Sequence, residues 1–161
     1  MIVFLDYDGV LHPEGCSEPE RLFENAPRLA HTLEAFPGVG VVLSTSWRTK
    51  CTPAELLDPL PLVLRQRVLG STPRFSDLSP PPGLVPYRRQ AECVHWLASH
   101  GMALGPWWAL DDRAEWFTPY CENLIACDPR SGFDERIAAR LTSALTLARD
   151  RAGTNVDLML A

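Results

Sequence analysis

Two aspartates with one residue between them are the first groups in the chain that could do chemistry. Asp6 and Asp8 directly follow the apolar run 2–5, and Gly9 comes next. The run predicts a strand buried on both faces, and the glycine lets the backbone curl both acids around one point. Carboxylates in this position suit a hard cation and a phosphate. A plain strand end followed by a turn explains the spacing equally well, whereas an EF-hand fits poorly because Gly9 comes too early.

Further polar residues follow later strand-like runs. Ser44 comes directly after the run 39–43, and Asp111 and Asp112 come directly after the run 107–110. The carboxyl ends of parallel strands share one edge of a sheet, which is where such sheets bind ligands. This recurrence favours a site over a series of unrelated turns, although Ser44 could still be an ordinary turn serine.

Strand-like runs alternate with helix-like segments along the whole chain. The predicted strands are 2–5, 39–43, 67–70, 107–110 and 123–127. The predicted helices are 18–35, a short one beginning at 52–53, 62–66, 87–100 and 134–150, with a proline-rich loop at 79–86. This order predicts an α/β fold, a single doubly wound, Rossmann-like domain over residues 1–161. Its sheet would be mainly parallel and five-stranded, with helices on both faces and no large cap domain.

The apolar residues of each helix predict which side faces the core. Pro27 could divide the first helix into two, and Asp134 could cap the last. Trp107 and Trp108 alternate in a strand and are both expected in the core. The expected inward residues are Leu22, Phe23, Leu29, Ala30, Leu33 and Phe36 in the first helix, Ala91, Val94, Leu97 and Ala98 in the fourth, and Ile137, Leu141, Leu145 and Leu147 in the last.

Composition, charge and cysteine count limit the classes of protein to which this chain could belong. The 161 residues are 46% hydrophobic and 22% charged, as in an ordinary globular domain. The net charge of −5 gives no general nucleic-acid footprint. Five cysteines without a CxxC pair predict reduced thiols in a cytoplasmic protein. The first apolar run is too short for a signal peptide or a membrane span, so no membrane partner is expected.

The order and spacing of these motifs resemble the haloacid dehalogenase-like hydrolases over nearly the whole chain. The matching stretches are 6–11, a strand ending at Ser44, a basic residue opening a helix, and 110–112. The stretches 44–48, 107–112 and 127–129 are similar to the small, capless domains of this type in RNA-repair proteins.

The resemblance implies roles for the four acids. Asp6 would be the nucleophile that forms an aspartyl-phosphate, and Asp8 would act as general acid and then as general base. Mg²⁺ would be bound by Asp6, by the backbone carbonyl of Asp8 and by Asp111. Asp112 would either ligate the ion directly or hold a coordinated water.

The resemblance also implies a phosphate-binding set. Ser44 would hydrogen-bond a phosphate oxygen, with Thr45 next in line for that role. Arg89 at the start of a helix is the preferred third-motif base, Arg88 is its rival, and either could be only a solvated arginine. Arg48 could reach a substrate phosphate or pair with an acid. His12 could touch a leaving group but is more simply a loop residue.

These roles together predict a Mg²⁺-dependent phosphatase acting through an aspartyl-phosphate on a phosphorylated substrate. A capless site would be open and would suit a bulky substrate. Two alternatives stay open: a non-catalytic module that binds metal or phosphate, and a phosphatase or phosphotransferase acting on polynucleotide ends in nucleic-acid repair. The acidic charge weighs mildly against nucleic acid, and no sequence feature assigns an oligomeric state.

Overall fold

A single parallel sheet forms the centre of the molecule. The computed structural model describes residues 1–159, with side chains described through Ala152. The sheet has five strands in the order β3-β2-β1-β4-β5, and every neighbouring pair is parallel. The strands are β1 (Ile2–Leu5), β2 (Gly40–Leu43), β3 (Val68–Ser71), β4 (Trp107–Asp111) and β5 (Leu124–Ala126). The predicted five-stranded sheet is confirmed.

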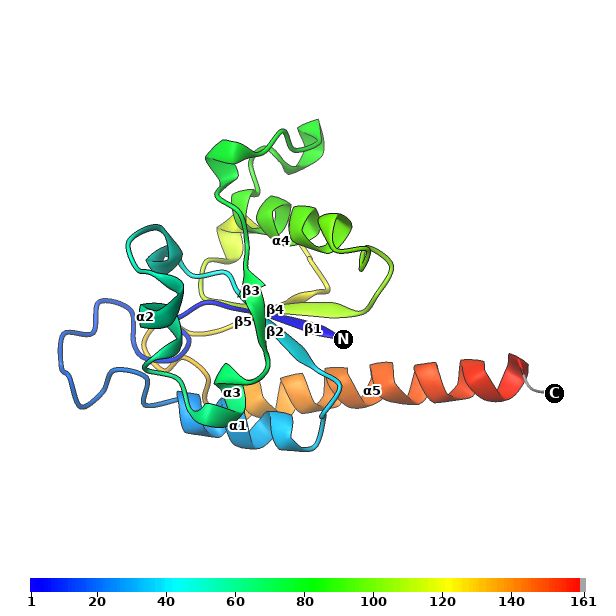
Figure 1. The fold of residues 1–161 in the computed structure, drawn as a ribbon, viewed down its shortest axis with the longest axis horizontal. Helices are drawn as coiled ribbons and strands as arrows, with labels where there is room; N and C mark the ends of the chain where they lie inside the picture. The colour runs from blue at the N-terminus through cyan, green and yellow to red at the C-terminus, as the bar shows by residue number, and fades with distance from the viewer. Residues whose placement is uncertain (160–161) are drawn as a thin grey trace.

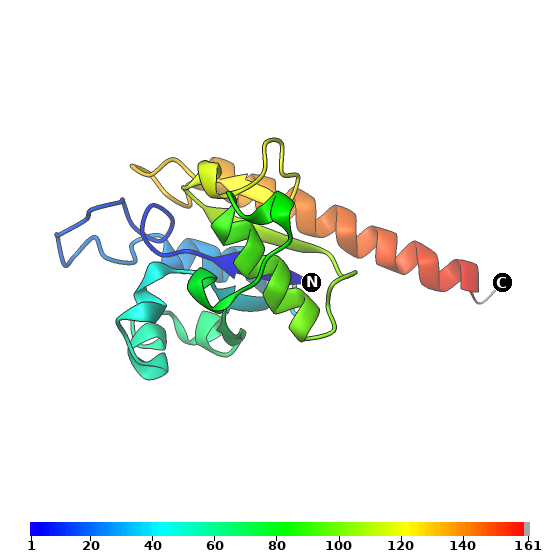
Figure 2. The same ribbon diagram turned by 90° about the horizontal axis from the view of Figure 1, so that it is seen from above.

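Helices cover both faces of this sheet. They are α1 (Ala26–Glu34), α2 (Pro53–Leu57), α3 (Leu62–Arg65), α4 (Arg88–Ser99) and α5 (Glu135–Met159). Short 3₁₀ turns are η1 (Ser46–Thr49), η2 (Phe75–Asp77), η3 (Pro82–Leu84) and η4 (Ala114–Trp116). The views in Figures 1 and 2 place α4 on one face and both α1 and α5 on the other. The predicted doubly wound α/β architecture is therefore confirmed.

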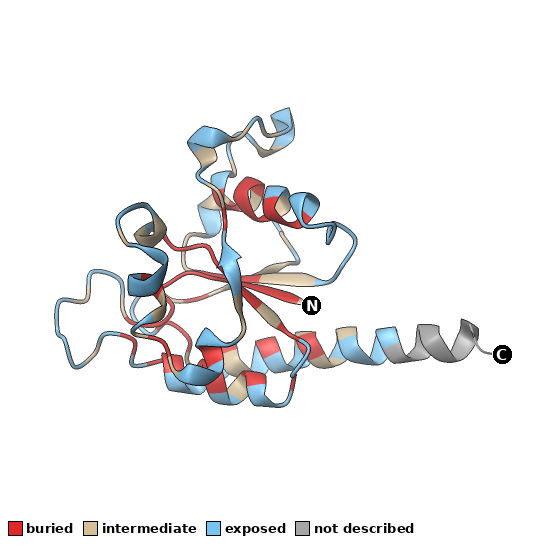
Figure 3. Cartoon of the chain, viewed as in Figure 1, coloured by how far each residue is buried: buried red, intermediate tan, exposed pale blue. Residues whose placement is uncertain are grey.

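The central strand β1 is buried on both faces, as its continuous apolar run predicts. Val3 and Leu5 join the core under α1 and α5, whereas Ile2 and Phe4 join the core under α4. The strands and the inner sides of the helices make up most of the buried residues in Figure 3. Trp107 and Trp108 pack against opposite cores and are both partly buried, so the alternation expected for them is confirmed.

The first helix begins later than predicted. It starts at Ala26 rather than near Glu18, and Pro27 stands in its first turn. Proline is tolerated there because the first N–H groups of a helix have no partner inside the helix. Phe23 has a positive φ of 60°, which excludes it from a right-handed helix. Pro27 therefore starts this helix instead of dividing it, and Leu22, which was expected inward, is 37% exposed.

The last helix is capped as predicted, because a carboxylate oxygen of Asp134 accepts a 2.9 Å hydrogen bond from the Ile137 amide. Two other expectations for α5 were wrong. The helix continues to Met159 instead of ending near Asp150. Leu147, expected inward, is 60% exposed, in keeping with a helix whose carboxyl-terminal half extends beyond the sheet (Figure 1).

The buried face of α4 also differs from the prediction. Cys93 and Trp96 lie in the core, whereas Ala98 is exposed and Val94 is only partly buried. Ala91 and Leu97 are buried as predicted, but aliphatic spacing missed Trp96, whose ring fills the core under Phe4 and packs edge-on at 5.9 Å.

The strand order defines the place where a ligand would bind. The chain moves from β1 through β2 to β3 on one side, and β4 then returns to the other side of β1. Ligands of doubly wound sheets bind at the carboxyl ends of the strands beside such a switch point. Within residues 1–159, the segments between strands hold only short helices, α4 and 3₁₀ turns, so they form no large cap. None of the described helices is long and apolar enough to cross a membrane.

Candidate active site

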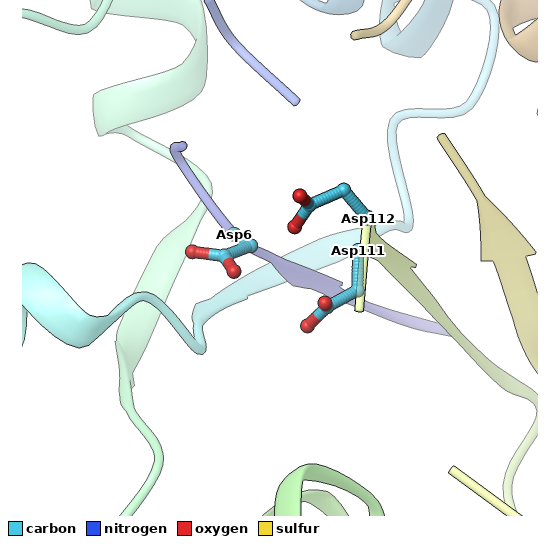
Figure 4. A group of neighbouring side chains, drawn as sticks. All are labelled: Asp6, Asp111 and Asp112. Carbon is cyan, nitrogen blue, oxygen red and sulfur yellow. The ribbon is translucent and has the colours of Figure 1, made fainter. Parts of the chain in front are cut away.

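Three acidic side chains meet at the switch point between β1 and β4. Asp6 directly follows β1, Asp111 ends β4, and Asp112 comes next. The Asp6 amide donates a 3.1 Å hydrogen bond to the Leu110 carbonyl, which joins the two strand ends. One carboxylate oxygen from each acid lies within 4.8 Å of the other two (Figure 4). The structure thus brings three of the four predicted acids together from positions about a hundred residues apart.

Gly9 makes room for this arrangement. Its φ is +67°, a conformation that glycine adopts at little cost. A Cβ built on Gly9 would lie 2.4 Å from Cγ of Asp112, well inside van der Waals contact. The turn after β1 can therefore approach the third carboxylate only because residue 9 carries no side chain.

Arg89 is the positive charge buried among the acids. It comes from the first turn of α4 and is 3% exposed. Its Nη2 lies 3.4 Å from Oδ2 of Asp6, and its Nε lies 3.4 Å from Oδ2 of Asp111. Its Nη1 is buried without a hydrogen-bond partner. Arg88, the rival sequence candidate, forms no ion pair with these acids, and its guanidinium carbon lies 3.6 Å from the centre of the Trp116 ring.

Burial makes the acid cluster costly to ionise in the absence of a cation. Burial raises the pKa of Asp6, and the nearby Arg89 guanidinium opposes this shift. Burial likewise raises the pKa of Asp111 to about 8 and the pKa of Asp112 to about 6. Oδ2 of Asp111 is buried and receives no hydrogen bond. Three converging carboxylates with an unsatisfied buried oxygen fit a hard, oxygen-binding divalent ion.

The Asp8 carboxylate lies apart from this group. One of its oxygens accepts a 2.9 Å hydrogen bond from Nε1 of Trp47, and the other is 3.1 Å from Nε2 of His12. The hydrogen bond to His12 lowers the pKa of Asp8. His12 is a loop residue as expected, but it is only 1% exposed. Trp47 could not be predicted as a partner of Asp8, because the two residues are 39 positions apart in the chain.

A pocket of about 340 Å³ opens over the acids. Asp6, Asp8, Asp112 and Arg89 line it together with Glu14, Gly15, Ser46, Arg113 and Trp116. The sequence predicted none of the last five as site residues. Arg113 could have been suspected, since it directly follows the second acidic pair.

Ser44 and Thr45 do not line this pocket and are fully buried. The Ser44 amide donates a 2.8 Å hydrogen bond to the Leu5 carbonyl, and the Ser44 hydroxyl has no partner. The Thr45 hydroxyl accepts a 3.3 Å hydrogen bond from the Trp47 amide and also lowers the pKa of Asp6 by hydrogen bonding. The Thr45 hydroxyl therefore lies beside Asp6, whereas the Ser44 hydroxyl is buried at the end of β2 without a hydrogen-bond partner.

Arg48 was expected either to reach a substrate phosphate or to pair with an acid, and it pairs with an acid. Its Nη2 lies 2.7 Å from Oε1 of Glu92, and both side chains are 8% exposed. The same guanidinium donates to the carbonyls of Ser44, Thr45, Thr72 and Pro73, which ties the ends of β2 and β3 together. Glu92 was missed, although it lies three residues after Arg89 on one helix face.

The order of the parallel strands, the acids at the ends of β1 and β4 and the arginine at the start of α4 together define a haloacid dehalogenase-like domain. Residues 2–138 match the family model described as the HAD domain in Swiss Army Knife RNA repair proteins, where HAD abbreviates haloacid dehalogenase. The chain belongs to this family, which confirms the resemblance found in the sequence. No curated protein and no solved structure matches the chain.

Proposed function

We propose that this domain is a Mg²⁺-dependent phosphatase that acts through an aspartyl-phosphate on Asp6. The single observation that carries the proposal is the convergence of Asp6, Asp111 and Asp112 beside Arg89 at the switch point of the sheet. Membership of a haloacid dehalogenase family supports a hydrolase of the phosphatase type.

Asp6, Asp111, Asp112 and the backbone carbonyl of Asp8 would hold Mg²⁺. When bound, the ion would neutralise the charge between the anionic nucleophile and the phosphate. The Asp6 carboxylate attacks phosphorus, the ester oxygen departs with a proton from Asp8, and an aspartyl-phosphate results. Because the pKa of Asp8 is lowered in the free protein, Asp8 must take up this proton when the anionic substrate binds beside it. Asp8 then takes a proton from the water that hydrolyses this intermediate, which restores free Asp6 and releases phosphate.

Positive charge and hydrogen bonds would hold the transferring phosphoryl group. The unpartnered Nη1 of Arg89 is a donor available to a phosphate oxygen. The unpartnered Ser44 hydroxyl and the neighbouring Thr45 hydroxyl complete the proposed set. His12 and Trp47 fix the orientation of Asp8 through their hydrogen bonds to its carboxylate.

A related candidate is a phosphatase or phosphotransferase acting on polynucleotide ends. The description of the family as a domain of RNA repair proteins favours this substrate class. An active site without a large cap also leaves space for a long chain beyond the terminal phosphate.

The proposal is tested with an aryl phosphate assay in the presence of Mg²⁺. Asp6→Asn should lower kcat by at least about a thousandfold, because the amide cannot act as the nucleophile. Asp58→Asn changes an aspartate whose side chain is 87% exposed and should leave turnover unchanged. A wild type that is inert towards aryl phosphates, nucleotides, phosphopeptides and phosphorylated oligonucleotides would favour a non-catalytic binding module instead.

A further inference from the structure

A second pocket lies directly beside the one that holds the acids. It has a volume of about 420 Å³ and shares Ser46, Arg89 and Trp116 with the first pocket. Its other walls come from η1, η2 and the start of α4. The two pockets therefore adjoin along one wall, and a ligand in the first could extend into the second.

The second pocket is strongly basic. Four arginines line it, namely Arg48, Arg74, Arg88 and Arg89, and Glu92 is its single acid. Arg48 and Arg89 lie near buried carboxylates, but the exposed Arg74 and Arg88 form no ion pair with any residue in the described part of the chain. Two guanidinium groups without a counter-ion thus face one small pocket in a protein of net charge −5.

These two free guanidiniums are held in place by contacts that leave donors unused. Arg88 stacks over Trp116 at 3.6 Å, which restricts its side chain. Arg74 donates one 3.3 Å hydrogen bond to the Thr49 carbonyl. The Tyr87 side chain does not cap α4, so the first amides of the helix also lack a side-chain acceptor.

We propose that this second pocket binds a second phosphate group of the same substrate molecule. Guanidinium groups bind phosphate oxygens through paired, charge-assisted hydrogen bonds. Because the pockets share three residues, the two phosphates would belong to one ligand: the phosphomonoester over Asp6 and another phosphate beside Arg74 and Arg88. The second group could be the neighbouring phosphodiester of an oligonucleotide end or the other phosphate of a small bisphosphate. This inference rests on the proposed function, which places a phosphomonoester over Asp6 in the first pocket.

The kinetic test compares substrates with one and two phosphates. The probes are thymidine 5′-monophosphate, thymidine 3′,5′-bisphosphate, and dithymidylates with a terminal phosphate at either end (pTpT and TpTp). Wild type should prefer a two-phosphate probe in kcat/KM, and Arg74→Ala and Arg88→Ala should each reduce that preference about tenfold, mainly through KM. A preference for dithymidylate over bisphosphate identifies the phosphodiester as the source. Equal kcat/KM for all probes, or a preference that survives both variants, overturns the proposal.

A binding measurement separates failure of this inference from failure of the proposed phosphatase. Calorimetric titration of Asp6→Asn with the same probes in Mg²⁺ should show tighter binding of the two-phosphate probes than of thymidine 5′-monophosphate. In the double variant with Asp6→Asn and Arg74→Ala, the affinity for the two-phosphate probes should be about tenfold lower. This result would support the pocket even if the wild type hydrolyses nothing. Arg149→Ala removes an exposed arginine on α5 and changes net charge equally, so it should not alter affinity. Loss of affinity in Arg149→Ala, or equal affinity for one and two phosphates, would contradict a specific pocket.

Discussion

The close approach of Gly9 to Asp112 decides where the third carboxylate can lie. Apolar runs and spacing were enough to predict the acids themselves, because strand ends of a parallel sheet share one edge. The spacing could not predict that the side chain of Asp8 stands apart, since its partners Trp47 and His12 are set by packing between loops. It favoured Arg89 over its rival Arg88, and the contacts of α4 place Arg89 beside Asp6 and Asp111.

Adding one methyl group at Gly9 should weaken metal binding. In Gly9→Ala the Cβ would meet the Asp112 carboxylate at 2.4 Å and displace it. We expect the Mg²⁺ dissociation constant to rise at least about tenfold, measured by calorimetry. Gly15→Ala is a matched control, because Gly15 has nearly the same φ (+69°) and nothing within 4 Å of its Cβ. Equal effects of both substitutions would attribute the change to backbone strain alone.

The acid cluster should make the metal-free protein more stable at pH 5 than at pH 8. The folded pKa values of Asp111 (about 8) and Asp112 (about 6) lie above the ordinary value of 3.8, so the folded state binds more protons in this interval. The free energy of unfolding therefore falls as pH rises from 5 to 8. Urea unfolding in EDTA measures it.

Mg²⁺ should oppose this pH trend, because it stabilises the ionised carboxylates and competes with protons. At a concentration of about 100 times Kd, it should add about 2.7 kcal/mol to the free energy of unfolding at pH 8. An identical pH dependence with and without the ion would show that the three acids do not hold it.

At the scale of secondary-structure elements, the Arg48–Glu92 pair connects three segments that converge on the site. Arg48 binds the carbonyls that follow β2 and β3, and Glu92 accepts a 2.9 Å hydrogen bond from the Phe75 amide. The strands were predictable because each is a short apolar run. The start of α1 was not, since the positive φ of Phe23 depends on tertiary contacts.

Removing the charge of Glu92 should destabilise the fold. Glu92→Gln would leave the Arg48 guanidinium buried without its counter-ion, at a cost of about 3 kcal/mol in the free energy of unfolding. Glu34→Gln, at a side chain that is 56% exposed, should change it by less than about 0.5 kcal/mol. Denaturant titration measures both variants. A Glu92→Gln protein as stable as wild type would mean that solvent reaches this pair.

At the scale of the whole molecule, two tightly packed cores separate buried from accessible thiols. Cys93 and Cys127 are buried, whereas Cys16, Cys51 and Cys121 are partly exposed. Burial raises the pKa of both Cys93 and Cys127, which disfavours their reactive thiolate forms.

Alkylation should therefore divide the cysteines into two groups. Iodoacetamide should modify Cys16, Cys51 and Cys121 in the native protein, and Cys93 and Cys127 only after unfolding in urea. Peptide mass spectrometry at successive times measures each rate. Native labelling of Cys93 as fast as that of Cys16 would contradict the packing of α4 on the sheet.

The loop after β1 is held by residues that come much later in the chain. The Val10 carbonyl accepts a 2.8 Å hydrogen bond from the Phe133 amide, and Nδ2 of Asn25 donates to the Ser131 carbonyl at 2.9 Å. A Cβ on Gly132 would lie 2.3 Å from the Val10 carbonyl oxygen, so the two loops are in close contact. During synthesis on the ribosome, the loop after β1 emerges early but gains these supports only when residues 131–133 have left the exit tunnel. A nascent chain arrested before that point would carry Asp6 without the finished pocket around it.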